Sequence, residues 1–258
     1  MTQSLHPSAS KGFSQSASLY QEVRPDYPSA LVHYLKACLK TFDQPSCIDL
    51  GAGTGKFLAT LLQVSPHILA VEPVSEMLEQ LQKAYPHVKT LQAFSHDLKI
   101  PNQSIDAIFC AQSFHWFANM ESLQEMQRIL KPNGHLFFIW NQRDVSIDWV
   151  QALADLIYPL EGDTPRYHSG QWQQLMQKQN LFKLQDAPTW SYHHVGSVEK
   201  VVSKRLLSTS FIAALSTYEQ QQLKLKFESI VQKFTGKIAT DELAFPYMTH
   251  LYHYQKQS

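Results

Sequence analysis

The sequence predicts an α/β fold built on a doubly wound, mainly parallel sheet. Short apolar segments that suit buried strands alternate with amphipathic segments of helical period over residues 28–140. Such alternation is typical of chains whose strands lie parallel in one sheet. Three glycines at alternate positions follow the first apolar segment, and an acidic residue ends the second. Both features are typical of the ligand-binding edge of a parallel sheet.

The first half of the chain contains most of the predicted sheet. It begins with a helix over 28–40, because apolar residues at 31, 35 and 39 lie on one side of it. Near its end, the turn-forming sequence Lys131-Pro132-Asn133-Gly134 separates a helix from a strand. After the first helix, the predicted elements are strand 46–50, helix 54–62, strand 67–71, helix 75–84, strand 88–93, strand 105–110, helix 120–130 and strand 135–140.

The second half is richer in helical patterns, and its strands are farther apart. Periodicity alone indicates pairs of helices between strands, and it does not indicate strand direction. The predicted elements are helices 148–160 and 168–178, strand 182–194, helices 198–213 and 217–234, and a final strand 244–254.

The segment Cys-Ile-Asp-Leu-Gly-Ala-Gly-Thr-Gly-Lys-Phe, residues 47–57, predicts a tight turn from a strand into a helix. Glycine suits such a turn because a Cβ atom would block the turn and the close approach of a ligand. A dinucleotide loop, G-x-G-x-x-G, would need glycine at Lys56. A phosphate-binding P-loop would need glycine at Leu50 and a hydroxyl at Phe57. An adenosylmethionine loop, D/E-x-G-x-G-x-G, fits from Asp49 to Gly55 without a mismatch.

Glu72 ends the second apolar segment, about twenty residues beyond the first loop glycines. An acidic residue at this place accepts hydrogen bonds from ribose hydroxyls in nucleotide-binding α/β folds. Its two carboxylate oxygens can accept from two hydroxyls of a diol. The alternative is a carboxylate that caps the helix beginning near Ser75.

Composition favours a reduced, soluble, cytoplasmic protein without a nucleic-acid or membrane partner. The chain has 258 residues and no formal net charge, and its basic residues form no stripe. No apolar segment is long enough to cross a membrane, and the N-terminus has no signal-peptide pattern. The cysteines, Cys38, Cys47 and Cys110, are odd in number, and two lie on predicted strands, so we expect buried thiols.

The segment Ala111-Gln112-Ser113-Phe114-His115-Trp116-Phe117 directly follows strand 105–110. Together with the glycine loop and Glu72-Pro73, it resembles the type 11 group of class I S-adenosylmethionine-dependent methyltransferases. The nearest likeness is to small-molecule methyltransferases related to trans-aconitate methyltransferase, over nearly the whole chain. The further segments that carry it are Gly12-Phe13-Ser14 through Tyr20, Arg24-Pro25, Tyr27-Pro28, Trp140 to Asp144, and Phe245-Pro246-Tyr247.

The resemblance implies a Rossmann-like sheet of seven strands, mostly parallel with an antiparallel last strand, and a helical cap over the cofactor. We therefore expect one methyltransferase domain over residues 1–258, as a monomer or weak homodimer. Its expected parts are an N-terminal lid and first helix (1–44), a cofactor-binding core (45–144), cap elements with the sixth strand (145–243) and the last strand (244–258).

The expected cofactor is S-adenosyl-L-methionine. The cofactor would contact the backbone of the glycine loop. Glu72 would accept hydrogen bonds from its ribose, and Arg24 would pair with its carboxylate. Relatives often carry an acidic residue after the third strand, whereas this chain has Ala93 to Asp97, so the Ser95 backbone amide is expected to contact adenine. The predicted cofactor contacts are Tyr20, Arg24, Asp49, Gly51, Ala52, Gly53, Glu72, Pro73, Met77, Ser95 and Gln112.

His115 is the candidate catalytic residue because the resemblance places its segment beside the transferred methyl group. It could be a general base for a hydroxyl, a hydrogen-bond donor to a carboxylate, or a packed side chain. Arg143 would pair with a substrate carboxylate or form an ion pair with Asp144. The predicted substrate contacts are Tyr27, Trp116, Trp140, Asn141, Arg143, Tyr167 and His168.

The predicted function is methyl transfer to a small organic molecule, by carboxyl O-methylation. Two other functions stay open, an NAD(P)-binding oxidoreductase and a non-catalytic adenosylmethionine-binding protein. No metal is expected at His193-His194 or His250-x-x-His253, because supporting cysteine or acidic ligands are missing and residues three apart on a strand face opposite sides.

Overall fold

The computed structural model describes residues 22–257, and its contacts divide the chain into two compact units. The first, called the sheet unit, comprises Tyr27–Asn141, Pro165–Trp190 and the chain from Thr249. The second, called the helical unit, comprises the chain up to Asp26, Gln142–Thr164 and Ser191–Met248. Three of the boundaries between the units, at 141/142, 190/191 and 248/249, lie within strands. Each unit has its own buried core.

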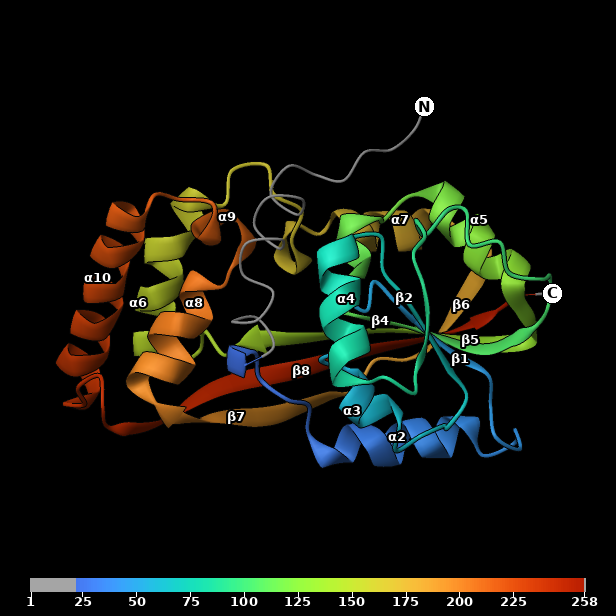
Figure 1. Ribbon diagram of the computed structural model, residues 1–258, viewed down its shortest axis with the longest axis horizontal. Coiled ribbons are helices and arrows are strands. Elements are labelled where there is room, and N and C mark those ends of the chain that lie inside the picture. The colour runs from blue at the N-terminus through green and yellow to red at the C-terminus, as the bar shows by residue number, and fades with distance from the viewer. Residues whose placement is uncertain (1–21, 258) are drawn as a thin grey trace. The chain divides into compact units, whose positions relative to one another are not determined.

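The sheet unit follows the predicted strand–helix alternation (Figure 1). No helix among residues 22–257 is long and apolar enough to span a bilayer. The elements of this unit are α2 (Ser29–Leu39), β1 (Cys47–Leu50), α3 (Leu58–Leu61), β2 (Ile68–Val71), α4 (Ser75–Ala84), β3 (Lys89–Leu91), β4 (Ile105–Ala111), η1 (Phe114–Trp116), α5 (Met120–Ile129), β5 (Leu130–Arg143), η3 (Tyr167–Ser169), α7 (Gln171–Lys178), β6 (Phe182–Asp186), β7 (Thr189–Ser197) and β8 (Glu242–Lys256), of which β5, β7 and β8 continue into the helical unit.

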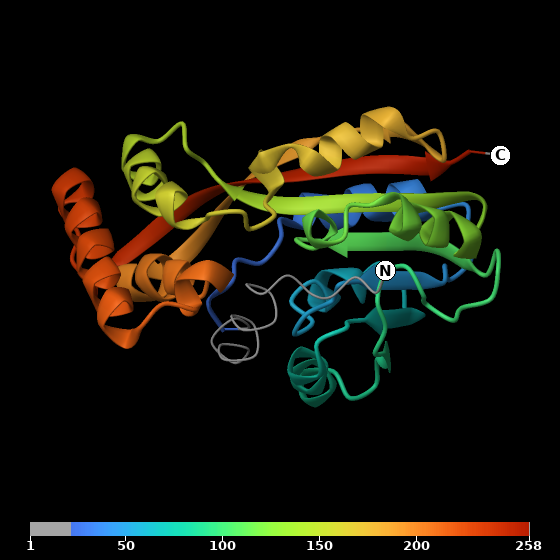
Figure 2. The same cartoon turned by 90° about the horizontal axis from the view of Figure 1, so that it is seen from above.

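The strands lie in the order β3-β2-β1-β4-β5-β8-β6, and β7 pairs with β8. The pairs β1–β2, β1–β4, β2–β3 and β4–β5 are parallel, whereas β6 and β8 are antiparallel. In Figure 2, β8 (red) runs beside β5 (green). The predicted mostly parallel sheet with an antiparallel last strand is therefore confirmed, with eight strands within residues 22–257 in place of the predicted seven.

The strand order places the glycine loop where the sheet changes direction. From β1 the chain proceeds outward through β2 and β3, and β4 then returns to pair with the other side of β1. The carboxyl ends of β1 and β4 are therefore neighbours, with Gly51 after one and Gln112 after the other. Doubly wound sheets bind their ligands at this switch point.

Two apolar layers cover the sheet, one on each face. Leu35 of α2, Leu61 of α3 and Leu81 of α4 pack on one face with Phe109 and Phe137, whose rings stack at 4.9 Å. Helices α5 and α7 cover the other face, and Figure 1 shows them opposite α2 and α3. Strands buried on both faces are expected in parallel sheets and explain their continuous apolar sequences.

Helix α3 is shorter than the predicted helix 54–62. It begins at Leu58, and residues 53–57 form turns. Gly55 has φ +85°, a left-handed conformation that cannot belong to a right-handed helix. A Cβ atom at Gly55 would also lie 3.1 Å from side-chain atoms of Leu58, Leu81 and Tyr85. The third glycine of the motif therefore delays the helix.

The turn predicted at Lys131 to Gly134 lies inside β5 as an irregularity. The pairing of β4 with β5 passes from Ile105–Leu130 directly to Ala107–His135. Asn133 has φ +61° within this interval, which asparagine tolerates better than most residues. The turn signal was correct about backbone conformation, but the strand continues on both sides of it.

The predicted strand 182–194 is wrong as one element, because the structure has β6 and β7 there. The break contains Pro188, which lacks the amide proton that a strand ladder needs. The amide of Leu251 in β8 donates to the Pro188 carbonyl across this break. Both strands pair with β8, so the proline divides one predicted strand without removing it from the sheet.

The helical unit contains α6 (Asp148–Ile157), η2 (Tyr158–Leu160), the π-helical turn η4 (Glu199–Lys204), α8 (Arg205–Leu207), α9 (Ser210–Ala213) and α10 (Thr217–Thr235). Helix α10 begins with a capping box between Ser216 and Glu219, and its core side packs against α6 and η4. The single helix predicted over 198–213 is wrong, because Thr209 is extended (ψ 132°) and separates α8 from α9. The Ser208 hydroxyl donates to the Arg205 carbonyl, the kind of local bond that competes with a helix.

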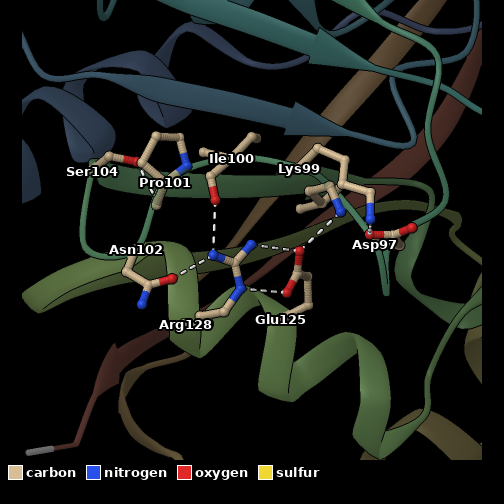
Figure 3. Close-up of polar contacts among 9 residues, drawn as sticks. Asp97, Lys99, Ile100, Pro101, Asn102, Ser104, Glu125 and Arg128 are labelled. Atoms are coloured by element: carbon tan, nitrogen blue, oxygen red, sulfur yellow. Dashed lines mark hydrogen bonds and ion pairs between the residues drawn. The ribbon is translucent and has the colours of Figure 1, made fainter.

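The loop between β3 and β4 is fastened to α5 by one arginine. Arg128 donates to both carboxylate oxygens of Glu125, to the Ile100 carbonyl and to the Asn102 side chain (Figure 3). Glu125 in turn accepts from the Leu98 amide at 2.8 Å. The segment that carries Ser95 is therefore held by α5.

Replacing Arg128 by alanine should lower the stability of the protein by about 1–3 kcal/mol, because a carboxylate and a loop carbonyl lose their donor. Thermal unfolding should shift down by roughly 2–4 °C per kcal/mol. The matched control is Lys99→Ala, whose ion pair with Asp97 is exposed, at 80% and 56% of the two side chains, and which should change little. Equal shifts for both variants would contradict the role given to Arg128.

Candidate active site

The glycine loop turns sharply at the end of β1, and each of its glycines is left-handed. The amides of Gly51 and Ala52 both donate to the Val71 carbonyl, at 2.8 and 3.0 Å. A Cβ atom at Gly51 would lie 2.6 Å from the Ser113 Cβ, so this position excludes any larger residue. At Gly53, with φ +58°, an added Cβ would meet only Met77, at 3.8 Å or more. The loop is therefore packed against β4 at Gly51 and open at Gly53.

Glu72 closes the loop from the side of β2. One of its carboxylate oxygens accepts from the Gly53 amide at 2.9 Å, and the other accepts from the Val74 amide at 3.0 Å. Val74 is the N-cap residue of α4, so this second bond holds the residue before the helix, and Glu72 does not cap an amide of its first turn. Burial raises the pKa of Glu72 to about 7, against the two amide bonds, which lower it. Each oxygen keeps a further lone pair, so both can still accept from hydroxyls.

Asp49 is fully buried at the end of β1, and neither carboxylate oxygen has a hydrogen-bond partner among the described residues. Burial, together with the smaller effect of the charge of Glu72, raises its pKa to about 8. The ordinary pKa of an aspartate is about 3.9. A carboxyl group held in this way is stabilised by a proton or by a nearby cation.

Three other predicted cofactor residues border the loop or the strand ends beside it. Met77 is buried next to Gly53, and the Pro73 carbonyl accepts from Gln92 at 3.2 Å. The Ser95 hydroxyl bonds to Ser122 of α5 at 2.7 Å, so its side chain points toward the helix.

Gln112 has a strained backbone at the end of β4. Its φ is +59°, uncommon for a residue other than glycine, and its amide donates to the Ile139 carbonyl at 2.8 Å. Such conformations gather at functional sites, where the surrounding structure holds them. Ser113, which follows, donates to the Leu50 carbonyl at 2.7 Å and touches Gly51. The sequence contained Ser113 in a motif but carried no signal for this packing role.

His115 has a defined tautomer when neutral. The indole Nε1 of Trp140 donates to His115 Nδ1 at 3.1 Å. An indole nitrogen can only donate, so Nδ1 must accept, and the proton of the neutral ring lies on Nε2. In this arrangement Nε2 is a hydrogen-bond donor. The imidazole is also 5.1 Å from the ring of Trp116.

Trp140 is fully buried in an aromatic cluster, which holds its indole in place. Its ring lies 4.5 Å from Trp172 and 5.1 Å from Tyr167. The Tyr167 hydroxyl bonds to that of Tyr252 at 2.8 Å, and burial raises the pKa of Tyr167. Trp140 can therefore orient His115 from the core side of the sheet.

The remaining predicted residues of the sheet unit lie at different places. Asn141 is buried, and its Oδ1 accepts from the Thr249 hydroxyl at 2.6 Å. Tyr27 packs edge-on against Phe57 at 5.1 Å. His168 lies half-buried in η3.

Arg24 and Arg143 belong to the helical unit, and Tyr20 lies outside the described residues. Arg24 donates to the Ser208 carbonyl at 2.9 Å. Asp144, the alternative partner of Arg143, accepts from the amide and hydroxyl of Ser146. Burial lowers the pKa of Arg143.

Cys47 and Cys110 are buried thiols on β1 and β4, as expected from the sequence, and Cys38 is half-buried. Within residues 22–257, no three histidine, cysteine or acidic side chains are grouped as ligands of a metal ion.

Residues 48–138 match the family model of the type 11 methyltransferase domain. An uncharacterized methyltransferase of Schizosaccharomyces pombe is 30% identical over 238 residues, which cover 92% of this chain and 94% of that protein. A methyltransferase-like protein of the same yeast is 29% identical over 248 residues, 96% of each chain. A solved structure from Anaeromyxobacter dehalogenans, assigned as a type II methyltransferase, has a TM-score of 0.68 at 19% identity, covering 91% of this chain and 97% of that one. That structural likeness shows the fold.

Replacing Asp49 by asparagine should stabilise the protein above neutral pH. The folded-state pKa is raised to about 8, so wild-type stability falls as pH rises from about 4 through 8, while the ionised form is forced into the core. The gain in the free energy of unfolding should therefore be larger at pH 8 than at pH 5, measured by urea denaturation.

Asp106→Asn is the matched control for this variant. Asp106 is also buried, but it accepts from the Ser46 amide at 2.9 Å and from Lys131 at 2.8 Å. Removing its charge should destabilise the protein, since the buried carboxylate loses its ion pair with Lys131 and a charge-assisted bond from the Ser46 amide. A loss of stability for Asp49→Asn at pH 8 would contradict the orphaned state of that carboxyl group.

Proposed function

This chain belongs to the type 11 family of S-adenosylmethionine-dependent methyltransferases, and we propose that it transfers the methyl group of that cofactor to a carboxylate of a small organic molecule. Family membership supports the transferase activity and the cofactor. The choice of a carboxylate as acceptor rests on the hydrogen bond between Trp140 and His115.

The residues at the ends of β1 and β2 fit the cofactor. When bound, S-adenosylmethionine supplies an electrophilic methyl group on a sulfonium. The open, left-handed backbone at Gly53 leaves room for a ligand that a side chain would fill. Glu72 has two carboxylate lone pairs to offer to ribose hydroxyls. Gly51 and Ala52 complete the loop, and Met77 offers an apolar side chain beside it for adenine.

Ionisation of the buried Asp49 is favoured by a cationic ligand nearby. The amino-acid end of S-adenosylmethionine and its sulfonium are both cationic, and either would stabilise the ionised form of Asp49. We propose that Asp49 acts on the ligand through its charge and not through a hydrogen bond, because its own oxygens are fully buried.

The tautomer of His115 distinguishes a general base from a hydrogen-bond donor. A general base needs an unprotonated nitrogen facing the acceptor, and Nδ1 is engaged by Trp140. Nε2 bears the proton and can donate to an acceptor oxygen. A carboxylate needs no base because it is ionised at neutral pH. We therefore propose that His115 orients the acceptor carboxylate for in-line attack, in which positioning supplies much of the rate.

The aromatic cluster around Trp140 keeps that donor in one direction. Trp172 donates from its indole to the Tyr167 carbonyl at 3.0 Å, so the rings are joined by a polar bond as well as by packing. We propose that Tyr167, His168, Tyr27, Trp116 and Asn141 take part in enclosing the acceptor, as the family resemblance predicts.

Replacing Glu72 by glutamine should weaken S-adenosylmethionine binding by roughly 10- to 100-fold, the effect of losing charge-assisted hydrogen bonds to the ligand and to the loop amides. Isothermal titration calorimetry measures this affinity. Glu76→Gln, at the second residue of α4, is the matched control and should bind as the wild type does.

NAD serves as the second ligand in the same titration. Binding of NAD without binding of S-adenosylmethionine would contradict the proposal, and unchanged affinity in Glu72→Gln would remove Glu72 from the cofactor site.

Two His115 variants should differ in the rate of methyl transfer. His115→Gln can place a donor near the position of Nε2, whereas His115→Asn can only replace the acceptor at Nδ1. We expect the asparagine variant to be slower by roughly 10- to 100-fold and the glutamine variant to keep part of the activity. Transfer of labelled methyl to carboxylic acids and phenols measures both.

The pH dependence of transfer is the control for these variants. A carboxylate acceptor should react at a nearly constant rate between pH 6 and 8. A rate that rises with pH through that range, together with equal losses in both variants, would identify His115 as a general base instead.

A further inference from the structure

The helical unit contains a group of arginines that no pattern in the sequence brought together. Arg143 lies at the end of β5, and Arg205 begins α8. Leu206, next to Arg205, packs in the same core as Tyr247, and the segment of Tyr247 is bonded to that of Arg143. The positive charge of Arg205 also contributes to lowering the pKa of Arg143. Arg24, in the same unit, donates to the Ser208 carbonyl. Cations gathered in a half-buried place repel each other unless an anion is near.

Buried hydroxyl and N–H groups without partners accompany these arginines. Tyr247 of β8 is 1% exposed, and its hydroxyl has no hydrogen-bond partner among the described residues. The Nε of Arg205 and the hydroxyl of Ser210, which is 2% exposed, are also buried without partners there. A buried donor left without a partner destabilises a fold, so these groups in one unit indicate a missing acceptor.

Tyr247 is close to Arg143 through the pairing of their chain segments. The Asp144 amide donates to the Pro246 carbonyl at 3.1 Å, so the residues next to Arg143 and Tyr247 are bonded across the two strands. Burial lowers the pKa of Arg143. A smaller effect of Tyr247 raises it, and the positive charge of Arg205 lowers it again. Leu206, which follows Arg205, packs in the same core as Tyr247. The three groups therefore share one region of the helical unit.

The charges around Arg143 do not balance. Among the described groups that act on its charge, Arg205 is a cation, Tyr158 and Tyr247 are neutral phenols, and Glu161 is the one acid. Two guanidinium groups, those of Arg143 and Arg205, therefore act with one carboxylate among these groups. An oxyanion would add the missing charge, and a planar guanidinium pairs with a carboxylate through two parallel bonds.

We propose that Arg143, Arg205 and Tyr247 form a binding site for a carboxylate group of a small molecule. The guanidinium groups supply the charge and the N–H donors, and the phenol supplies a neutral donor. The binding of a carboxylate at this site does not depend on the proposed function. The identity of that carboxylate, as part of the methyl acceptor or of the amino-acid end of the methyl donor, rests on the proposed function.

The test measures binding and not methyl transfer. Calorimetry is performed on the full chain with acetate, succinate, citrate and benzoate, with S-adenosylmethionine, and with decarboxylated S-adenosylmethionine, which lacks the carboxylate. Dimethyl succinate is the neutral counterpart of succinate. Sodium chloride keeps the ionic strength equal, since surface charges would otherwise respond to salt.

The variants are chosen to keep the fold. Arg205→Met retains an unbranched stem of similar reach, and Tyr247→Phe removes only the hydroxyl. Lys204→Met removes an exposed cation from the preceding residue and is the matched control. Because the Tyr247 hydroxyl is unpartnered, Tyr247→Phe should unfold at the same temperature as the wild type or a higher one without ligand.

We expect Arg205→Met to weaken carboxylate binding by roughly 10- to 100-fold and Tyr247→Phe by roughly 2- to 10-fold, with Lys204→Met unchanged. Loss confined to the free acids, with S-adenosylmethionine unaffected, assigns the site to the acceptor. Loss confined to S-adenosylmethionine, with the decarboxylated form unaffected, assigns it to the donor.

Wild-type affinity of Arg205→Met for every carboxylate probe would overturn the proposal. Dimethyl succinate binding as tightly as succinate would also overturn it. Carboxylate binding that depends on Arg205 in a protein that transfers no methyl group would instead leave this site standing and refute the proposed function.

Discussion

The carboxylate of Glu72 organises the candidate cofactor site. By accepting from the Gly53 amide and the Val74 amide, it joins the glycine loop after β1 to the start of α4 after β2. The loop can take this course because its glycines adopt left-handed conformations and because Gly51 lies directly against Ser113. The carboxyl ends of β2, β1 and β4, which are neighbours in the sheet, thereby meet at the glycine loop.

Burial of acidic groups at this edge makes the site sensitive to charge. Asp49 and Glu72 are both buried, and their pKa values are raised to about 8 and about 7. Two neighbouring carboxyl groups that resist ionisation form an environment in which a cationic ligand is favoured. In the helical unit, two arginines, Arg143 and Arg205, act with one glutamate, Glu161.

The elements near the glycine loop followed closely from sequence because their signals are local. Helices α2, α4 and α5 and strands β1, β2 and β4 lie within a residue or two of the predicted ranges. The errors have definite causes. Gly55 delayed α3 through its left-handed backbone, Pro188 divided a strand, and Thr209 divided a helix. In each case the hydrophobic pattern predicted the right type of element, and the backbone conformation of one residue interrupted it.

The sequence by itself determined the fold class, the family and the position of the glycine loop, because glycine conformation, strand alternation and an acidic strand end are properties of short segments. The tertiary structure decided what depends on distant residues meeting. Trp140 sets the tautomer of His115, Ser113 fills the space beside Gly51, and Asp49 is buried in the folded sheet without a hydrogen-bond partner among the described residues. The segments of Arg143 and Arg205 are about sixty residues apart in sequence, and only packing with Tyr247 brings them into one part of the helical unit.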